Sequence, residues 1–466
     1  MSLSRFPLAR RQVLGAAAAL PLMSRTAFAA DAVTVTLDPA ARLRAIPADY
    51  MGLGYEISSV AVKGLLAGTN RTYVQLVKNL GARGVIRIGG NTSDFSSYEA
   101  QGEAKSLPKG TVTNQANLHE LRTFLDATGW RLIWGLNLGS DKLDNAVEQA
   151  RAVAGIMGDR LIALEIGNEP DLFPNQNHRP RPYDFAMWLA DYRRYKTAIR
   201  AVLPRVPFAG PDLAGAVDWM EQFARQESDI TLLTAHHYIT GQANPAATLE
   251  TLLAPNLRYR ASLARFQAAS KLAGKPWRMC ETASFSGGGK AGVSDTFASA
   301  LWVLDYLFEL ASFGCAGVNM QTGVNHLGRI SYYTPIGDDL QGHYTAAPEY
   351  YGLLAFAQAG KGETVAAHCD AANLTAYAVR QSDNRLCVVL INKDQSQDAT
   401  ATIKGIGPNG ARMMRLTAPS LTATNGITLG GASVDGAGIW SGKTKSVRLA
   451  NGLQVPAGSA ALVWPS

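Results

Sequence analysis

The sequence predicts an α/β protein in which a (β/α)8 TIM barrel precedes a C-terminal all-β sandwich domain. From residue 48 to 350, short apolar segments alternate with amphipathic helical patterns, as in repeated βα units. From 351 to 466, β-branched segments alternate with Gly, Asn and Asp turns. Parallel strands joined by helices close into a barrel whose active site lies at the carboxyl ends of the strands.

Eight apolar segments are the predicted barrel strands. An open doubly wound sheet is the competing architecture, but the stretch 89–93 lacks the glycine spacing of a phosphate-binding loop. The eight segments are Tyr50–Tyr55, Val85–Gly89, Leu132–Asn137, Ala163–Ile166, Pro207–Gly210, Thr231–Ala235, Trp277–Cys280 and Gly317–Met320.

Two of the intervening helices have clear ends. The first begins after Asn70 and stops at Gly81. For the second, Asn117 followed by Glu120 predicts a capping box, and Gly129 stands where a C-terminal cap belongs.

The first 29 residues have the pattern of a twin-arginine signal peptide. Arg10 and Arg11 precede an apolar run at 15–22, and a small-residue cleavage site follows at 27–29. A membrane anchor is the alternative, but this run is shorter than the roughly 18 apolar residues that a span needs. We therefore expect a periplasmic or secreted protein. Residues 30–47 contain an alternating strand that we expect to pair with the C-terminal sandwich.

Charge and cysteine content exclude several function classes. Loss of the signal removes four arginines and no acid, which lowers the formal charge from +7 to +3, so no nucleic-acid partner is indicated. The four cysteines have no CxxC spacing, and we expect neither a metal nor a cofactor. Cys369 and Cys387 lie on neighbouring predicted strands and form either a disulfide or two free thiols. We expect a monomer.

Two glutamates stand at the ends of apolar strands. Glu169 precedes Pro170, whose missing N–H ends a strand, and Glu281 follows the segment Trp277–Cys280. Glutamate is seldom buried without a partner, so a purely structural role is the less favoured alternative. Two isolated acids at strand ends are typical of an enzyme that hydrolyses glycosidic bonds.

Five motifs resemble glycoside hydrolase family 79, which contains β-glucuronidases and heparanases among the retaining barrel glycosidases. The resemblance covers the barrel and, more loosely, the C-terminal domain. The motifs are Val85-Ile-Arg-Ile-Gly-Gly-Asn-Thr-Ser-Asp94, Glu165-Ile-Gly-Asn-Glu-Pro-Asp-Leu172, Ala209-Gly-Pro-Asp212, His236-His-Tyr238 and Glu281-Thr-Ala-Ser284.

The resemblance implies a role for each member of the pair. Glu169 is then the acid/base, Glu281 the nucleophile, and Asn168 reaches the sugar 2-hydroxyl. Glu56 and Asn91, which follow the first two strands, are placed to bind sugar hydroxyls, and closing a loop is the alternative for each.

Three further residues are expected to support the acids. Arg87 can hold Glu281 ionised or form an interior ion pair with Glu165, and Tyr238 can donate to Glu281. Strand alternation sends His236 toward the barrel interior, where a satisfied core histidine is the alternative to a site residue.

The run after the nucleophile strand suggests the substrate. In the run Ser286-Gly-Gly-Gly-Lys290, successive glycines, including Gly288 and Gly289, can turn backbone N–H groups toward an anion, and Lys290 would add charge. A flexible turn is the alternative. We expect Tyr332 or Tyr333 to complete this pocket for a uronate carboxylate, and the spacing leaves the choice between them open.

The sequence thus predicts a retaining glycosidase that releases β-linked glucuronic acid from a glycan or glycoside. Three alternatives remain: an endo-acting heparanase-like enzyme, a related glycosidase for a neutral sugar, and an inactive carbohydrate-binding protein. Neither the aglycone nor tolerance for 4-O-methyl or sulfated sugars can be inferred.

Overall fold

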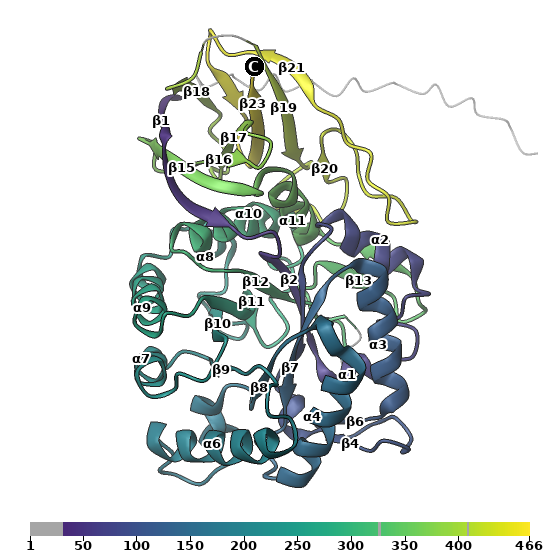
Figure 1. The fold of residues 1–466 in the computed structure, drawn as a ribbon. Helices are drawn as coiled ribbons and strands as arrows, with labels where there is room; N and C mark the ends of the chain where they lie inside the picture. The colour runs from purple at the N-terminus through teal and green to yellow at the C-terminus, as the bar shows by residue number, and fades with distance from the viewer. Residues whose placement is uncertain (1–30, 325–327, 408–409) are drawn as a thin grey trace, which may run out of the picture.

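The computed structural model describes residues 31–324, 328–407 and 410–466. The predicted signal peptide, residues 1–29, lies outside the described residues. In Figure 1 the helix-wrapped barrel forms the lower body and the C-terminal sheet stands above it, with α10 and α11 at the junction.

Eight parallel strands form the barrel, and all eight predicted strands are confirmed. Neighbours pair in the order β8-β7-β3-β2-β12-β11-β10-β9, and a parallel bridge between Leu164 and Phe208 joins the two ends of the sheet. The strands are β2 Met51–Glu56, β3 Val85–Gly89, β7 Arg131–Leu136, β8 Leu161–Ile166, β9 Ala209–Leu213, β10 Leu232–Gly241, β11 Trp277–Ser286 and β12 Val318–Gln321.

Strands β10 and β11 run further than their apolar cores predict. They stay paired from Leu233 and Trp277 as far as Gly241 and Ser286. This extension carries polar residues beyond the barrel mouth, and it brings the glycine run after Ser286 into the wall of the cleft described below.

Helices cover the outside of the barrel. The longer ones are α2 Arg71–Asn79, α3 Gln115–Thr128, α4 Leu143–Met157, α6 Phe185–Val202, α7 Val217–Gln226, α9 Leu257–Ala273, α10 Phe297–Ser312 and α11 Pro348–Ala359. Short helical segments are α1 Ile57–Val60, η1 Ser93–Phe95, η2 Gly158–Arg160, η3 Pro170–Leu172, α5 Phe173–Gln176 and α8 Leu249–Leu253.

The helix caps confirm one prediction and correct another. Asn70 caps α2 by accepting from the N–H of Tyr73 at 3.2 Å. Helix α3 begins earlier than predicted, because Asn114 is its N-cap and exchanges hydrogen bonds with Asn117, which is the third helical residue. Gly129 ends α3 with a φ of 79°, as expected of a C-terminal glycine.

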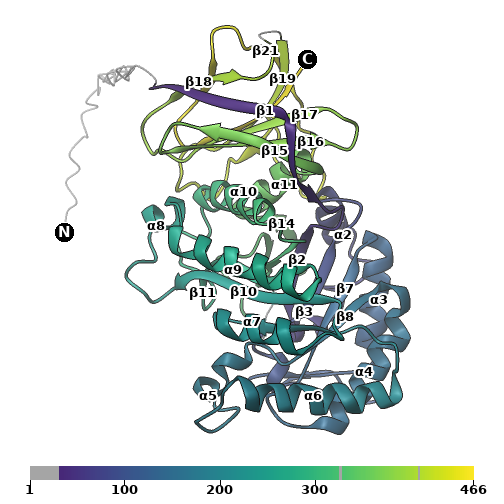
Figure 2. The same cartoon turned by 60° about the vertical axis from the view of Figure 1, so that its left-hand side comes forward.

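The C-terminal sheet contains ten strands, and one of them comes from the start of the described chain. β1 pairs antiparallel with β15 and parallel with β18, and Figure 2 shows it running along the sheet. The strands are β1 Asp31–Ile46, β15 Gly362–Cys369, β16 Leu374–Gln381, β17 Leu386–Asn392, β18 Ala399–Lys404, β19 Gly410–Thr417, β20 Thr428–Leu429, β21 Lys445–Arg448, β22 Leu453–Val455 and β23 Ser459–Pro465. Small sheets outside it are β4 Ser97–Tyr98, β5 Lys105–Ser106 with β6 Thr111–Thr113, and β13 Ile336–Asp338 with β14 Tyr344–Ala346.

Alternation along β17 gives this sheet two apolar faces. Val389 and Ile391 join the core shared with the barrel, whereas Val388 and Leu390 face a second core within the domain. The four cysteines are free thiols, so Cys369 and Cys387 form no disulfide in this structure. Cys387 belongs to the barrel-side core and Cys369 packs against the second core, which places the two thiols on opposite faces.

The junction of the two domains is helical. α11 crosses the predicted boundary at residue 350, ends at Ala359 and packs on α10. The division of the chain at that residue stays a prediction. Within the described residues, no helix combines the length and the apolar character that a membrane crossing requires.

Candidate active site

Glu169 and Glu281 meet at the carboxyl ends of their strands. Glu169 follows β8 in a left-handed conformation, with φ 51°, and its N–H donates to the carbonyl of Asp212 at 2.9 Å. A carboxylate oxygen of Glu169, a ring nitrogen of His236 and a carboxylate oxygen of Glu281 all lie within 4.8 Å of one another. This approach suits a retaining pair, because inverting pairs stand about 6.5 to 9.5 Å apart.

Two donors hold the Glu281 carboxylate. Arg87 donates to Oε2 at 2.8 Å, and the Tyr238 hydroxyl donates to Oε1 at 2.7 Å. Both oxygens are therefore fixed, which orients the carboxylate toward the cleft. Burial raises the pKa of Glu281, while the positive charges of His236 and Arg87 oppose that rise.

Arg87 is fully buried and joins four polar side chains. It donates to Glu165 at 2.9 Å, to Glu281, to the Asn168 side-chain oxygen at 2.9 Å, and to Asp212. Both alternatives for Arg87 are thus present together, the interior ion pair with Glu165 and the contact with Glu281. One guanidinium compensates three buried carboxylates, so it organises the whole floor of the site.

His236 connects Glu169 to Asp212. Its Nδ1 lies 3.0 Å from Glu169 Oε1 and its Nε2 lies 2.8 Å from Asp212 Oδ1. Burial opposes a charged ring, but Asp212 and Glu281 outweigh it and hold the pKa of His236 well above its ordinary value. Despite its burial, Asp212 has a pKa of about 2, because Arg87 and His236 favour its ionised form.

Glu56, Asn91 and Asn168 lie together near the acids. The Asn168 amide donates to the Asn91 side-chain oxygen at 3.1 Å, and Glu56 accepts from the N–H and hydroxyl of Thr92 at 2.9 and 2.6 Å. Glu56 and Asn91 line the cleft. At Gly90, with φ 75°, an added Cβ would lie 2.3 Å from the Glu56 carboxylate, so only glycine leaves room for that side chain.

A cleft of about 620 Å³ opens over the two glutamates. Tyr332 and Tyr333 both line it, so the structure does not choose one over the other by position alone. Tyr333 is buried with its ring 6.2 Å from that of Tyr238, whereas Tyr332 is 50% exposed. The remaining lining residues include Leu172, Ala214, Thr240, Gly241, Gln242, Ser286, Arg329, Ile330 and Ser331.

The glycine run reaches the cleft only in part. Gly287 and Gly288 line it, and among the described residues no group accepts from their N–H groups. Gly289 is a correction, because its N–H donates to the carbonyl of Phe285 at 3.1 Å. Lys290 is a second correction: it is exposed and outside the cleft lining, and its N–H is bound to Ser294 at 2.8 Å.

Known proteins match this chain at three levels. The model of the "Glycosyl hydrolase family 79 C-terminal beta domain" matches residues 376–462. A protein named Beta-glucuronidase from Neurospora crassa is 27% identical over 81% of this chain and 78% of its own length. Another Beta-glucuronidase, from Aspergillus niger, is 27% identical over 72% and 71%.

These matches support membership of glycoside hydrolase family 79. A solved 4-O-α-L-rhamnosyl-β-D-glucuronidase from Fusarium oxysporum has the same fold as this chain, with a TM-score of 0.76 and 20% identity over 92% of this chain and all of that one. An α-L-arabinofuranosidase from Thermotoga maritima has a TM-score of 0.70 at 14% identity, covering 93% and 99%. At these identities the two structures support the fold alone.

Three residues of this family 79 site carried no role in the sequence interpretation. Asp212 and Asp94 stood inside motifs, yet their partners come from distant segments. Asp94 accepts from the N–H groups of Asn168, Leu138 and Gly139, each at 2.8 Å, and so fixes the loop that holds Asn168. Arg329 gave no sequence signal at all, because it follows β12 in an irregular loop.

Two groups of side chains have the spacing of metal ligands. They are Glu165, Asp212 and Cys280, and Glu169, His236 and Glu281. Arg87 contacts a carboxylate in each group. Its fixed positive charge would repel a divalent cation at either place, so the geometry suits proton transfer and nucleophilic attack better than metal binding.

Proposed function

We propose that this protein is a retaining β-glucuronidase that releases β-linked glucuronic acid from glycans or glycosides. One observation carries the proposal: the carboxylates of Glu169 and Glu281 approach within 4.8 Å at the mouth of the barrel and have different partners. The names of the family 79 relatives support glucuronic acid as the sugar.

In the first step Glu281 attacks the anomeric carbon while Glu169 protonates the leaving oxygen. Arg87 and Tyr238 hold the attacking carboxylate in place, which limits the reorganisation that the step requires. As Glu169 gives up its proton it becomes negative. His236, in contact with Glu169 Oε1, stabilises that charge.

In the second step Glu169 accepts a proton from water, which attacks the anomeric carbon and releases Glu281. His236 remains in contact with Glu169 while the Glu169 carboxylate acts as the base. Two inversions at one carbon preserve the β configuration of the released sugar.

We assign recognition of the sugar carboxylate to the part of the cleft wall that contains Gly287, Gly288, Arg329 and Tyr333. Among the described residues nothing accepts from the N–H groups of Gly287 and Gly288, and three successive glycines there have φ between 82° and 104°. Tyr333 offers a hydroxyl donor, and Arg329 is a cleft-lining cation without an ion-pair partner among the described residues. Lys290, the cation predicted from the sequence, is replaced in this assignment by Arg329.

The proposal is tested by comparing hydrolysis of p-nitrophenyl β-D-glucuronide and p-nitrophenyl β-D-glucoside. We expect kcat/KM to favour the glucuronide by at least about 100-fold, since the glucoside lacks the carboxylate and leaves the donors of this wall without their charge-assisted hydrogen bonds. Preference for the glucoside would support the neutral-sugar alternative. Tight glucuronide binding without turnover would support the inactive binding protein.

We further propose exo-action, export and a monomeric state. Exo-action rests on a cleft whose wall includes the glycine loop and Tyr332, and release of monomeric uronic acid alone from an oligosaccharide would support it. Export through the twin-arginine route to the periplasm or medium rests on Arg10 and Arg11 before the apolar run. Replacing both arginines with lysine should retain the protein in the cytoplasm. Size-exclusion chromatography tests the monomeric state.

A further inference from the structure

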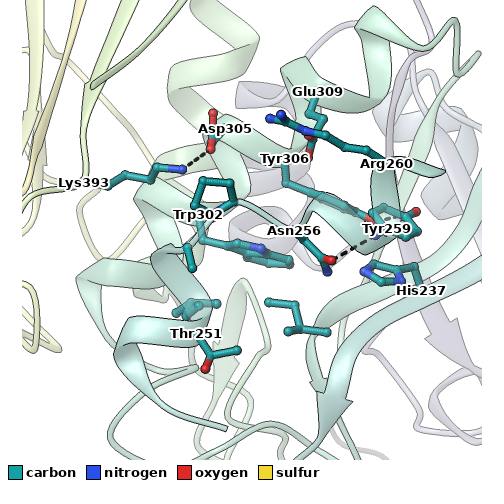
Figure 3. A pocket seen from close by; sticks show the side chains of 14 residues that line it. His237, Thr251, Asn256, Tyr259, Arg260, Trp302, Asp305, Tyr306, Glu309 and Lys393 are labelled. Carbon is teal, nitrogen blue, oxygen red and sulfur yellow. Dashed lines mark hydrogen bonds and ion pairs between the residues drawn. The ribbon is translucent and has the colours of Figure 1, made fainter. Parts of the chain in front are cut away.

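A second cavity lies on the outer side of β10, away from the catalytic cleft. Its volume is about 300 Å³, and α8, α9, α10 and the start of the loop after β17 line it. Figure 3 shows the side chains of His237, Asn256 and Trp302 around one space. His236 and His237 are consecutive, so they point to opposite sides of the strand, and the barrel wall separates this cavity from Glu169 and Glu281.

The charged groups of this outer cavity are neutralised in pairs. Lys393, from the C-terminal domain, forms an ion pair with Asp305 at 2.5 Å, and Arg260 forms one with Glu309. His237 adds no charge at neutral pH, because burial lowers its pKa to about 3. A charged ligand would find no uncompensated partner here, so the cavity favours a neutral one.

Several polar atoms of the outer cavity have no protein partner. Among the described residues, nothing hydrogen-bonds to the ring nitrogens of His237, to Trp302 Nε1 or to the Asn256 side-chain nitrogen. These atoms are not among the buried polar atoms that lack a partner, so each is accessible to solvent. A ligand with hydroxyl groups would fill these positions, because the imidazole offers both a donor and an acceptor and the other two are donors.

Aromatic surfaces supply the apolar part of the same cavity. The rings of Trp302 and Tyr306 stack with centroids 5.2 Å apart, and those of His237 and Tyr259 stack at 3.4 Å. The tyrosine hydroxyls already have partners, since Tyr306 contacts Thr282 at 2.9 Å and Tyr259 at 3.3 Å. The rings line the cavity, so its wall includes apolar aromatic surface that the C–H groups of a sugar can contact.

We propose that the outer cavity is a second binding site, for one neutral pyranose unit of a glycan. The neutralised charges, the unfilled donors and acceptors and the aromatic surfaces together match a ligand that is uncharged, rich in hydroxyls and apolar on one face. The site does not depend on the proposed glucuronidase activity, because no residue of the cleft takes part in it.

The experiment titrates methyl β-D-glucopyranoside into the full-length mature protein by NMR saturation transfer and calorimetry. We expect a Kd on the order of 1 mM for a site of this size. Ala254→Trp should weaken binding at least tenfold, because this exposed lining residue can fill the cavity without disturbing a buried contact. Ala264→Trp is the matched control on the exposed face of α9 and should leave binding within twofold.

A second variant tests the chemistry rather than the space. His237→Phe keeps a ring against Tyr259 and removes both nitrogens, so we expect at least a fivefold loss of affinity with an unchanged Tm. Hydrolysis of p-nitrophenyl β-D-glucuronide by Ala254→Trp should match that of the unaltered protein, which separates this test from the proposed function. The proposal is overturned if no binding is detected at a glucoside concentration 50 times the expected Kd. It is also overturned if neither Ala254→Trp nor His237→Phe weakens binding, or if phenol binds and the sugar does not.

Discussion

Two adjacent histidines on β10 face opposite sides of the barrel wall and differ in charge at neutral pH, because His236 is positive and His237 is neutral. His236 faces inward, where Asp212 and Glu281 outweigh burial and hold its pKa well above the ordinary value. His237 faces outward against Tyr259, and burial alone lowers its pKa to about 3. Burial lowers the pKa of both rings, so the difference comes from the carboxylates that only His236 contacts. The inner face of β10 therefore carries charged groups that suit proton transfer, whereas its outer face carries a neutral histidine.

Removing the cation at the centre of the inner face should have the largest effect. Arg87→Met leaves Glu165, Asp212 and Glu281 buried without their shared partner, so we expect a loss of about 3 to 5 kcal/mol in the free energy of unfolding and no measurable turnover. Denaturant unfolding measures the loss. Arg265→Met is the matched control, because Arg265 also pairs with two carboxylates but at the surface, and should cost at most about 1 kcal/mol. Equal losses of unfolding free energy in the two variants would mean that the buried network stabilises the fold no more than a surface ion pair does.

The two histidines can be exchanged for phenylalanine one at a time. His236→Phe removes the group that contacts Glu169, so we expect kcat/KM for the aryl glucuronide to fall about 100-fold. His237→Phe should lower it at most about threefold. The comparison fails if both variants lose activity to the same extent.

The pH dependence of stability should report the inner acids. Burial and the charge of Asp212 raise the pKa of Glu165 from 4.5 to about 7. The folded protein therefore binds this proton more tightly than the unfolded chain. The resulting stabilisation is fully present below about pH 4.5 and is lost as the pH rises through about 7.

Glu165→Gln removes that titration. Between pH 4.5 and 7.5 the free energy of unfolding should decrease less in this variant than in the unaltered protein. The difference between the two decreases should be about 2 kcal/mol. Urea denaturation at several pH values measures the difference. An unchanged slope would show that Glu165 does not hold a proton in the folded state.

The smallest predicted effect compares two cations at the cleft. Arg329→Gln should raise KM for the glucuronide about tenfold, because Arg329 lines the cleft and forms no ion pair within the described part of the chain. Lys290→Gln should leave KM within twofold, since Lys290 is exposed outside it. The reverse ranking would restore the assignment made from the sequence.

The strands and the position of Glu169 and Glu281 at strand ends could be predicted from sequence because both depend on local patterns. A buried parallel strand is a short apolar run, and Glu169 and Glu281 follow such runs directly. Local patterns did not identify the N-cap of α3, because two asparagines lie three residues apart. Asn117 with Glu120 resembles a cap, but Asn114 captures the N–H of Asn117 and starts the helix one turn earlier.

Loop residues could not be placed because their positions depend on contacts between distant segments. Lys290 follows the glycine run, yet Ser294 binds its N–H and the side chain leaves the cleft. Arg329 enters the same cleft from the loop after β12, nearly 50 residues after Glu281 in the chain. The partners of Asp212 likewise come from β3 and β10, so no window of sequence contains them.

The central claim is that Glu281 attacks the sugar and Glu169 transfers the proton, and azide rescue tests both roles in one measurement. Glu281→Gly with azide and an aryl glucuronide should give the α-glucuronyl azide, because azide attacks once from the face that Glu281 occupied. Glu169→Gly should give the β-azide, because azide then displaces Glu281 in a second inversion. NMR of the anomeric proton distinguishes the products. No glycosyl azide from Glu281→Gly, or the β product from it, would contradict the account.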